Sequence, residues 1–300
     1  MFKIRYYLQL LRIHHYIKNF LILIPLFFSK FFLNTSLVTT AVLGFVCFSL
    51  LSSIVYIFND VKDIEKDRLH NTKNRRPLAS GKIPVLHAIL ILIIISTILS
   101  VLLIMLRIQG KRLFNINSIA LMFLYVVLNI AYSLGVKNIP IVDVTILASG
   151  YVIRVLFGAM IIDVNISIWL YLVITLGAYY MGLGKRRNEI IDNQTETRTV
   201  MKYYSHNFLD KNMYVCQALC IVFYSLWSID SVTVERFNTN AFVYTVPLVL
   251  IIFLKYSLNI ETEAEGDPTS VLLGDKILLL LCVIYIICVF FIIFLNRVTS

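Results

Sequence analysis

Long runs of apolar residues recur along this chain and restrict the folds it can adopt. Several runs reach the ~20 residues that a helix needs to cross about 30 Å of hydrocarbon. Of the 300 residues, 59% are hydrophobic and only 15% are charged, and the mean hydropathy is +0.83. A soluble domain of this length has no use for so much apolar side chain. We therefore expect a polytopic membrane protein that forms one integral domain over residues 1–300.

The apolar runs divide the chain into about nine expected membrane spans. A basic and aromatic segment, Met1–Lys18, precedes them and is expected to lie at the membrane interface. Two long polar loops, Asn59–Lys82 and Gly184–Lys211, interrupt the series. The expected spans are Tyr16–Phe32, Leu37–Phe58, Pro84–Leu106, Ser118–Leu134, Ile141–Ile162, Ile168–Leu183, Asn212–Ile229, Ala241–Leu258 and Asp275–Leu295. The fold class that follows is an all-α integral membrane protein.

The distribution of basic residues predicts the orientation of the chain. The formal net charge is +10, and most of the 27 lysines and arginines fall at the N-terminus and in alternate loops. Because cytoplasmic loops carry the excess of Lys and Arg, we expect the N-terminus and both long polar loops in the cytoplasm. Ser300 is then outside, and the protein resides in the cell membrane. The expected partners of these charges are anionic headgroups or substrates, not nucleic acid.

The first polar loop places carboxylates at helical spacing beside a basic cluster. Asp60, Asp63 and Asp67 fall at i, i+3 and i+7, and Asn59 starts a second set at i, i+4 and i+8 that shares roughly the same helix face. Carboxylates stacked in this way repel one another unless a cation lies between them, and oxygen ligands suit Mg²⁺. The basic residues that follow are Lys73, Arg75 and Arg76. A cation site beside them fits a diphosphate; the alternative is a solvated loop of mixed charge.

Arg154 is predicted to lie inside a membrane span. A charge at this depth is costly and usually functional, and it normally faces the interior of the helix bundle. The expected partner of Arg154 is an anionic group of a substrate. The alternative is a structural ion pair with Asp143.

The second polar loop begins with M-G-L-G-K-R-R-N-E, from Met181 to Glu189. Lys185 and Glu189 lie at i and i+4, so one interpretation is a membrane anchor with a local ion pair worth about 0.2–0.5 kcal/mol. The other interpretation is that Lys185 and Arg186 bind an anionic substrate. This second interpretation is favoured because the cluster is expected on the same membrane face as the acidic motif.

Together these motifs resemble the UbiA superfamily of intramembrane prenyltransferases. N-D-x-x-D-x-x-x-D at Asn59–Asp67 is similar to its first aspartate motif, and R-P-L-A-S-G at Arg76–Gly81 is most similar to its decaprenyl-phosphate phosphoribosyltransferase branch. The other stretches that resemble the family are K-N at Lys18–Asn19, Y-S-x-x-x-K-x-I-P-x-x-D at Tyr132–Asp143, K-R-x-x-E at Lys185–Glu189 and E-G-D-P-T at Glu265–Thr269. In the last of these, Asp267 is expected to cap a helix.

One departure from the family pattern is diagnostic. Ordinary prenyltransferases of the superfamily carry a second aspartate motif in the second loop, where it helps to hold a prenyl diphosphate. The nearest approach to it here is Asp192 with Glu196, after the basic cluster. Cations in place of acids favour a lipid monophosphate or a 5-phosphate over a second Mg²⁺–diphosphate.

The resemblance implies a bundle of about nine transmembrane helices around a central cavity that opens to the cytoplasm and sideways to lipid. It implies Mg²⁺, with Mn²⁺ as the alternative, held by Asn59, Asp60, Asp63 and Asp67. The three aspartates would be catalytic. The implied substrate-binding residues are Lys18, Asn19, Lys73, Arg75, Arg76, Lys137, Arg154, Lys185, Arg186 and Glu189.

The activity implied by this branch is transfer of 5-phosphoribosyl from 5-phosphoribosyl 1-diphosphate to a polyprenyl phosphate, a step in cell-wall biosynthesis. Two alternatives stay open. One is prenyl transfer from a polyprenyl diphosphate to an aromatic acceptor such as 4-hydroxybenzoate. The other is a transporter or lipid-binding protein without catalysis, which would explain the hydropathy but not the acidic spacing. The isoprenoid length and the oligomeric state are left open.

Overall fold

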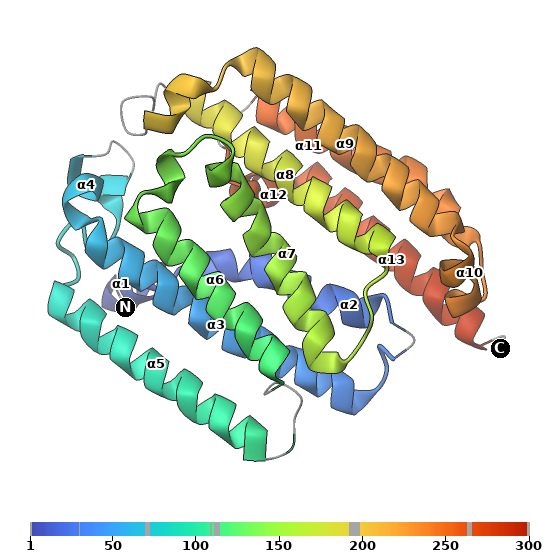
Figure 1. Ribbon diagram of the computed structural model, residues 1–300, viewed down its shortest axis with the longest axis horizontal. Coiled ribbons are helices and arrows are strands. Elements are labelled where there is room, and N and C mark those ends of the chain that lie inside the picture. Colours follow the sequence, from blue (N-terminus) through green and yellow to red (C-terminus); the bar gives the residue numbers. More distant parts are fainter. Residues whose placement is uncertain are drawn as a thin grey trace. The chain divides into compact units, whose positions relative to one another are not determined.

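The computed structural model describes residues 2–29, 31–69, 73–108, 110, 115–191, 199–262 and 266–298. Every regular element in these ranges is a helix (Figure 1), so the expected all-α fold is confirmed. The helices of the first half are α1 (Phe2–Leu10), η1 (Ile13–Leu23), α2 (Ile24–Phe27), α3 (Thr35–Lys62), α4 (Ile64–Leu69), η2 (Lys73–Arg75), α5 (Val85–Ile108), α6 (Ile116–Leu134), η4 (Val136–Asn138) and α7 (Val142–Ile162). Those of the second half are α8 (Ile168–Ile191), η6 (Thr199–Tyr203), α9 (His206–Ile229), α10 (Ser231–Phe237), η7 (Ala241–Thr245), α11 (Val246–Thr262), α12 (Pro268–Gly274) and α13 (Lys276–Val298).

Seven helical segments in the described ranges are long and apolar enough to cross a membrane, by length and composition. They are α3, α5, α6, α7, α9, the continuous η7–α11 run and α13. The two other expected spans differ. Ile13–Phe27 is a shorter apolar helix, and α8 has 24 residues but ends in the charged stretch that begins at Lys185. The count of nine is therefore not reproduced in the described residues.

Helices α5 and α13 show that the apolar surface faces outward. Their apolar windows have mean hydropathies of 3.2 and 3.5, yet only 17% of each window is buried inside the structure. On α5, Leu86, Ile93 and Ile98 are 65%, 54% and 50% exposed. A soluble protein rarely exposes such a continuous apolar surface, whereas lipid tails solvate it. The burial pattern thus agrees with the expected membrane environment.

The chain divides into two compact units, one made of Met1–Lys137 with Ile153–Asn165 and the other of Asn138–Val152 with Ile166–Ser300. The boundary falls within α7. The single domain over residues 1–300 and its central cavity stay predictions, and each unit is described by itself.

The core of the first unit lies where η1, α3, α6 and the last part of α7 pack together. Phe48, Tyr125 and Phe157 form its aromatic centre, with ring centroids 4.8 Å apart for Phe48 and Tyr125 and 5.3 Å apart for Phe48 and Phe157. Helix α7 approaches η1 so closely that a Cβ on Gly158 would lie 2.0 Å from the carbonyl oxygen of Ile22. A glycine is required there because the neighbouring group is backbone.

The core of the second unit is built on α8, which packs along α9 (Figure 1). Tyr180, Met213 and Ile260 are buried at its centre. Val271 of α12 packs against the same cluster. This packing anchors the C-terminal end of α8, which carries the second basic cluster.

Substitution of Gly158 tests the close approach of α7 to η1. We expect Gly158→Ala to lower the free energy of unfolding by at least the ~1–3 kcal/mol typical of overpacking, because the added methyl meets a carbonyl oxygen. The measurement is thermal unfolding of the purified protein in detergent. Gly177→Ala in α8 is the matched control, since its Cβ would meet only the Cys220 Sγ at 3.8 Å. Equal melting temperatures for the two variants would contradict the close contact between α7 and η1.

Candidate active site

The acidic motif lies at the polar end of α3 and continues into α4. Asn59 and Asp60 occupy the last turn of α3, and Asp63 is its C-terminal cap residue. Backbone hydrogen bonds from the Asp63 N–H to the Asn59 carbonyl (2.9 Å) and from the Asp67 N–H to the Asp63 carbonyl (2.8 Å) preserve the helical spacing. The expected helix is therefore present, but it is interrupted at Asp63, where ψ is 13°.

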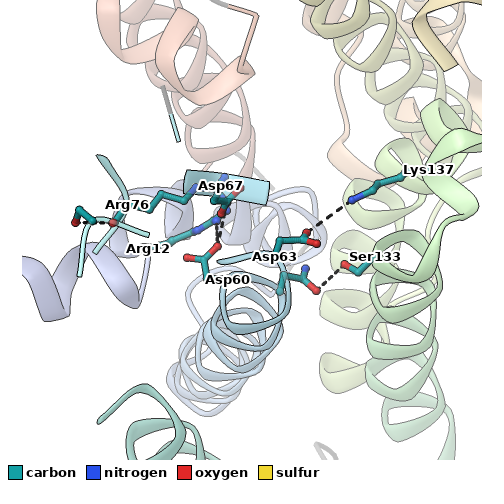
Figure 2. A network of polar contacts seen from close by, with 9 residues as sticks. Arg12, Asp60, Asp63, Asp67, Arg76, Ser133 and Lys137 are labelled. Carbon is teal, nitrogen blue, oxygen red and sulfur yellow. Dashed lines mark hydrogen bonds and ion pairs between the residues drawn. The ribbon is translucent and has the colours of Figure 1, made fainter. Parts of the chain in front are cut away.

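Asp60 and Asp67 share one cation. The Arg76 Nη1 atom lies 3.1 Å from Asp60 Oδ1 and 2.7 Å from Asp67 Oδ2. Arg12 forms a second ion pair with Asp60 Oδ1. Figure 2 shows the two carboxylates turned toward the two arginines. Both aspartates are buried, with 3% of Asp60 and 5% of Asp67 exposed. An ionised carboxylate in such a position destabilises the fold unless a cation pairs with it.

Asp63 points toward Lys137 of η4, just beyond the end of α6 (Figure 2). The Lys137 Nζ atom is 3.7 Å from Asp63 Oδ2. Asn59 Oδ1 accepts a hydrogen bond of 2.6 Å from the Ser133 hydroxyl, and Lys62 donates one of 2.7 Å to the Ser133 carbonyl. Sequence reasoning missed Ser133, although it lies within the Y-S-x-x-x-K stretch that also contains Lys137.

The four predicted metal ligands are thus adjacent but divided into two pairs. Among the described residues, no group of three or more His, Cys, Asp or Glu side chains is gathered closely enough to hold a metal ion. Nevertheless, Asp60 and Asp67 already converge on a single nitrogen of Arg76. Their hard oxygen donors, arranged around one positive centre, fit Mg²⁺. Ligation by all four residues stays a prediction.

The basic residues of the first loop are not equivalent. Arg76 contacts the carboxylates, whereas Arg75 is exposed and Lys73 is partly buried on η2. Arg76 is therefore placed directly on the acidic motif by its ion pairs with Asp60 and Asp67.

Arg154 is a buried cation that contacts Asn19, Tyr125 and Phe48. Its Nε donates a 2.7 Å hydrogen bond to Asn19 Oδ1, and its Nη2 donates one of 3.1 Å to the Tyr125 hydroxyl. The guanidinium lies 5.0 Å from the Tyr125 ring centroid and 5.3 Å from that of Phe48. Asn19, which is fully buried, also donates to the Ser49 hydroxyl at 2.9 Å. Asn19 and Arg154, each predicted to bind substrate, are thus in direct contact, and Tyr125 is a member of the cluster that sequence reasoning did not single out.

Asp143 has a partner other than Arg154. Its Oδ2 accepts a 2.6 Å hydrogen bond from Arg186 Nε, and both side chains are completely buried. The Tyr204 hydroxyl donates to Asp143 Oδ1 at 2.5 Å and accepts from the Ile141 N–H at 2.6 Å. Burial, followed by this hydrogen bond to Asp143, raises the pKa of Tyr204. The Tyr204 contact also holds Ile141 in a left-handed conformation, with φ of 69°, which is strained for a β-branched residue.

The cations at the end of α8 each have a carboxylate partner on a different element. Arg186 Nη1 is 2.5 Å from Glu189 Oε2, in addition to its pair with Asp143. The other pairs are Lys185 with Asp267 at 3.5 Å and Arg187 with Asp210 at 2.6 Å. These ion pairs connect α8 to the start of α7, to α9 and to the residue preceding α12. Substrate binding by Lys185, Arg186 and Glu189 stays a prediction, and Asp192 and Glu196 lie outside the described residues.

Asp267 caps α12, as the sequence predicted. Its Oδ2 accepts a 3.2 Å hydrogen bond from the Thr269 N–H. Gly266, directly before it, lies close to α8, because a Cβ on Gly266 would lie 3.0 Å from the Lys185 carbonyl oxygen. The E-G-D-P-T stretch, of which Glu265 lies outside the described residues, therefore has a structural role beside the second basic cluster.

The fully buried pair of Asp143 and Arg186 can be tested against the partly exposed pair of Asp210 with the next residue of α8, Arg187. We expect Asp143→Asn to lower the free energy of unfolding by about 3–5 kcal/mol, because it leaves a buried guanidinium without its carboxylate. Asp210→Asn removes the partner of Arg187, and since Asp210 is 30% exposed the expected loss is about 0–1 kcal/mol. Denaturant-induced unfolding in detergent measures both. Similar losses in the two variants would contradict the role assigned to Asp143.

Known proteins are similar to this chain over most of its length. The UbiA prenyltransferase family model matches residues 22–280. The decaprenyl-phosphate phosphoribosyltransferase of Corynebacterium glutamicum is 28% identical over 263 residues, which cover 85% of this chain and 76% of that protein. The protein of the same name from Mycobacterium tuberculosis strain H37Rv is 27% identical over 247 residues, covering 81% and 78%.

A solved structure confirms the fold. A UbiA homolog from Archaeoglobus fulgidus bound to GPP and Mg²⁺ superposes with a TM-score of 0.69 over 96% of this chain and 99% of that one, at 20% sequence identity. The resemblance read from the aspartate motif and its neighbours is therefore confirmed, including its similarity to the phosphoribosyltransferase branch. With the family model matching most of its length, this chain belongs to the UbiA prenyltransferase family of multi-pass membrane proteins.

Proposed function

We propose that this protein transfers the 5-phosphoribosyl group of 5-phosphoribosyl 1-diphosphate to a polyprenyl phosphate, with Mg²⁺ as cofactor and Mn²⁺ as the alternative. The observation that carries the proposal is the convergence of Asp60 and Asp67 on one cationic atom at the end of α3. The names of the relatives at about 28% identity support the choice of substrates. The basic end of α8, in place of a second aspartate motif, supports it too.

The acidic motif would bind the metal through Asn59, Asp60, Asp63 and Asp67. Bound there, Mg²⁺ would neutralise the negative charge that develops on a departing diphosphate. Arg76 lies directly on the carboxylates and would contact the diphosphate, with Lys73 and Arg75 in the adjoining segment. Lys137, beside Asp63, would add a further positive charge to the same group.

The lipid acceptor would use the buried cation of the first unit. Arg154 is held by Asn19 and Tyr125, so its guanidinium is already oriented, and a phosphate is a suitable anionic partner for it. Lys18, the neighbour of Asn19, would bind the same phosphate. Lys185, Arg186 and Glu189 of the second basic cluster are proposed as further substrate-binding residues.

The reaction needs no strong general base. An oxygen of the polyprenyl phosphate, which is already an anion, forms a bond to C1 of the ribose. The bond between C1 and the diphosphate oxygen breaks, and its electron pair leaves with diphosphate. The positive charge that develops on the ribose ring is compensated by the surrounding carboxylates and phosphates. The products are polyprenylphosphoryl-5-phosphoribose and diphosphate.

The topology required by this proposal has the N-terminus and the aspartate motif in the cytoplasm, where a soluble sugar diphosphate can reach them. The excess of basic residues in alternate loops supports this orientation. The cell membrane would then supply the lipid acceptor from its own plane.

A transfer assay tests the proposal. Purified protein, Mg²⁺, radiolabelled 5-phosphoribosyl 1-diphosphate and a polyprenyl phosphate should give label in the lipid phase. We expect Asp63→Asn to lower the rate by about 10²-fold or more, as loss of an electrostatic group at a reaction centre does. Glu65→Gln is the matched control, because Glu65 lies on the adjoining α4 with 82% of its side chain exposed; its rate should match the parent protein. Absence of metal-dependent label in the lipid would overturn the proposal.

The alternative is prenyl transfer from a polyprenyl diphosphate to an aromatic acceptor such as 4-hydroxybenzoate. The observation in its favour is that the structural neighbour from Archaeoglobus fulgidus was solved with GPP and Mg²⁺. This reaction would keep the metal site at the aspartate motif and exchange the donor and the acceptor. Product formation from these two substrates, with none from 5-phosphoribosyl 1-diphosphate, would select it.

A further inference from the structure

Arg12 reaches the acidic motif from the N-terminal segment, which the sequence placed at the membrane interface. It lies between α1 and η1 with φ of 52° and ψ of 45°, in the left-handed region. For a residue with a side chain this conformation costs on the order of 1–3 kcal/mol. Two backbone hydrogen bonds hold it, from the Arg12 N–H to the Gln9 carbonyl (3.1 Å) and from the His15 N–H to the Arg12 carbonyl (2.8 Å). The strained turn therefore directs the side chain of Arg12 toward Asp60.

The side chain of Arg12 is held as firmly as its backbone. Its guanidinium lies 4.8 Å from the ring centroid of Tyr56 and forms an ion pair with Asp60, and only 17% of the side chain is exposed. Asp60 Oδ1 accepts from both Arg12 and Arg76, and Arg76 also pairs with Asp67 (Figure 2). Two carboxylates thus face two guanidinium groups, and the formal charges of these four side chains sum to zero.

These ion pairs affect metal binding, if the metal binds at the aspartate motif as in the proposed function. A divalent cation that binds Asp60 and Asp67 takes the carboxylates away from Arg12 and Arg76. Two partly buried guanidinium groups would then lie beside a metal ion. The positive charges of the guanidinium groups and the metal ion repel one another. A metal arriving alone is therefore opposed by the arginines. Diphosphate removes the opposition, because guanidinium binds phosphate oxygens in bidentate fashion.

We propose that Arg12 and Arg76 are resident counter-ions of the aspartate motif, which exchange from the carboxylates to diphosphate when metal and diphosphate bind together. Arg12 is then a positioning residue that makes the two ligands bind cooperatively. The motif binds a divalent cation weakly when the cation is alone and more tightly when diphosphate binds with it. Because coupling between two ligands is reciprocal, diphosphate should also bind weakly without metal.

The test is equilibrium dialysis of the full-length protein in lipid nanodiscs against Mn²⁺, with and without inorganic diphosphate. Mn²⁺, diphosphate and their complex all pass through the dialysis membrane. The excess of Mn²⁺ in the protein compartment is therefore the bound metal. In the parent protein we expect diphosphate to lower the half-saturating Mn²⁺ concentration about tenfold or more, within the range usual for coupled sites. In Arg12→Gln, Mn²⁺ alone should bind more tightly than in the parent protein, and the effect of diphosphate should shrink to about threefold or less on the same scale.

Two further variants keep the result interpretable. Arg5→Gln removes an exposed arginine of α1 and should retain the coupling of the parent protein. Arg12→Lys keeps the charge but loses the bidentate geometry, so its coupling should be intermediate, and it serves if Arg12→Gln does not fold. Equal Mn²⁺ binding in the parent protein, Arg12→Gln and Arg12→Lys, with an unchanged diphosphate effect, would overturn the inference.

The same experiment separates this inference from the proposed function. Coupled binding of Mn²⁺ and diphosphate in a protein that transfers no phosphoribosyl group would support the counter-ion exchange and contradict the phosphoribosyl donor. Failure to bind Mn²⁺ even with diphosphate would overturn both, because it removes the metal from the aspartate motif.

Discussion

The ion pairs that Asp60 and Asp67 make with Arg76 are the interaction on which this site depends. They bring together the last turn of α3, the short helix α4 and the segment after η2. Carboxylates with so little exposure are stable only if a cation is close. The protein supplies that cation itself, and the proposed reaction replaces it with a metal ion of higher charge. The fold therefore keeps the acids close together at a place where they would otherwise repel.

The second unit uses charge for a different purpose. Lys185, Arg186 and Arg187 follow one another at the end of α8, yet each pairs with a carboxylate from another element. The fully buried pair of Arg186 with Asp143 also engages Tyr204, which in turn holds the strained backbone at Ile141. Basic residues that look like a substrate cluster in the sequence thus organise the ends of several helices. Any substrate that binds there meets a network that is already ordered.

The sequence predicted what depends on local patterns. Apolar runs predicted an all-α membrane protein, and the spacing of Asp60, Asp63 and Asp67 predicted carboxylates one helical turn apart. The break at Asp63 was not predictable, since no Gly or Pro marks it. The pairing of Arg12 with Asp60 joins residues 48 positions apart, and hydrophobic periodicity carries no information on such a contact. For the same reason, nothing in the sequence singled out Tyr125 as a partner of Arg154.

A competition experiment decides whether the donor is a phosphoribosyl diphosphate. Purified protein would receive 5-phosphoribosyl 1-diphosphate with polyprenyl phosphate and, in the same tube, a polyprenyl diphosphate with 4-hydroxybenzoate. Mass spectrometry of the extracted lipids then identifies the product. The account predicts polyprenyl phosphate that has gained one phosphoribosyl group, formed only when a divalent metal is present. Prenylated 4-hydroxybenzoate as the sole product would contradict it.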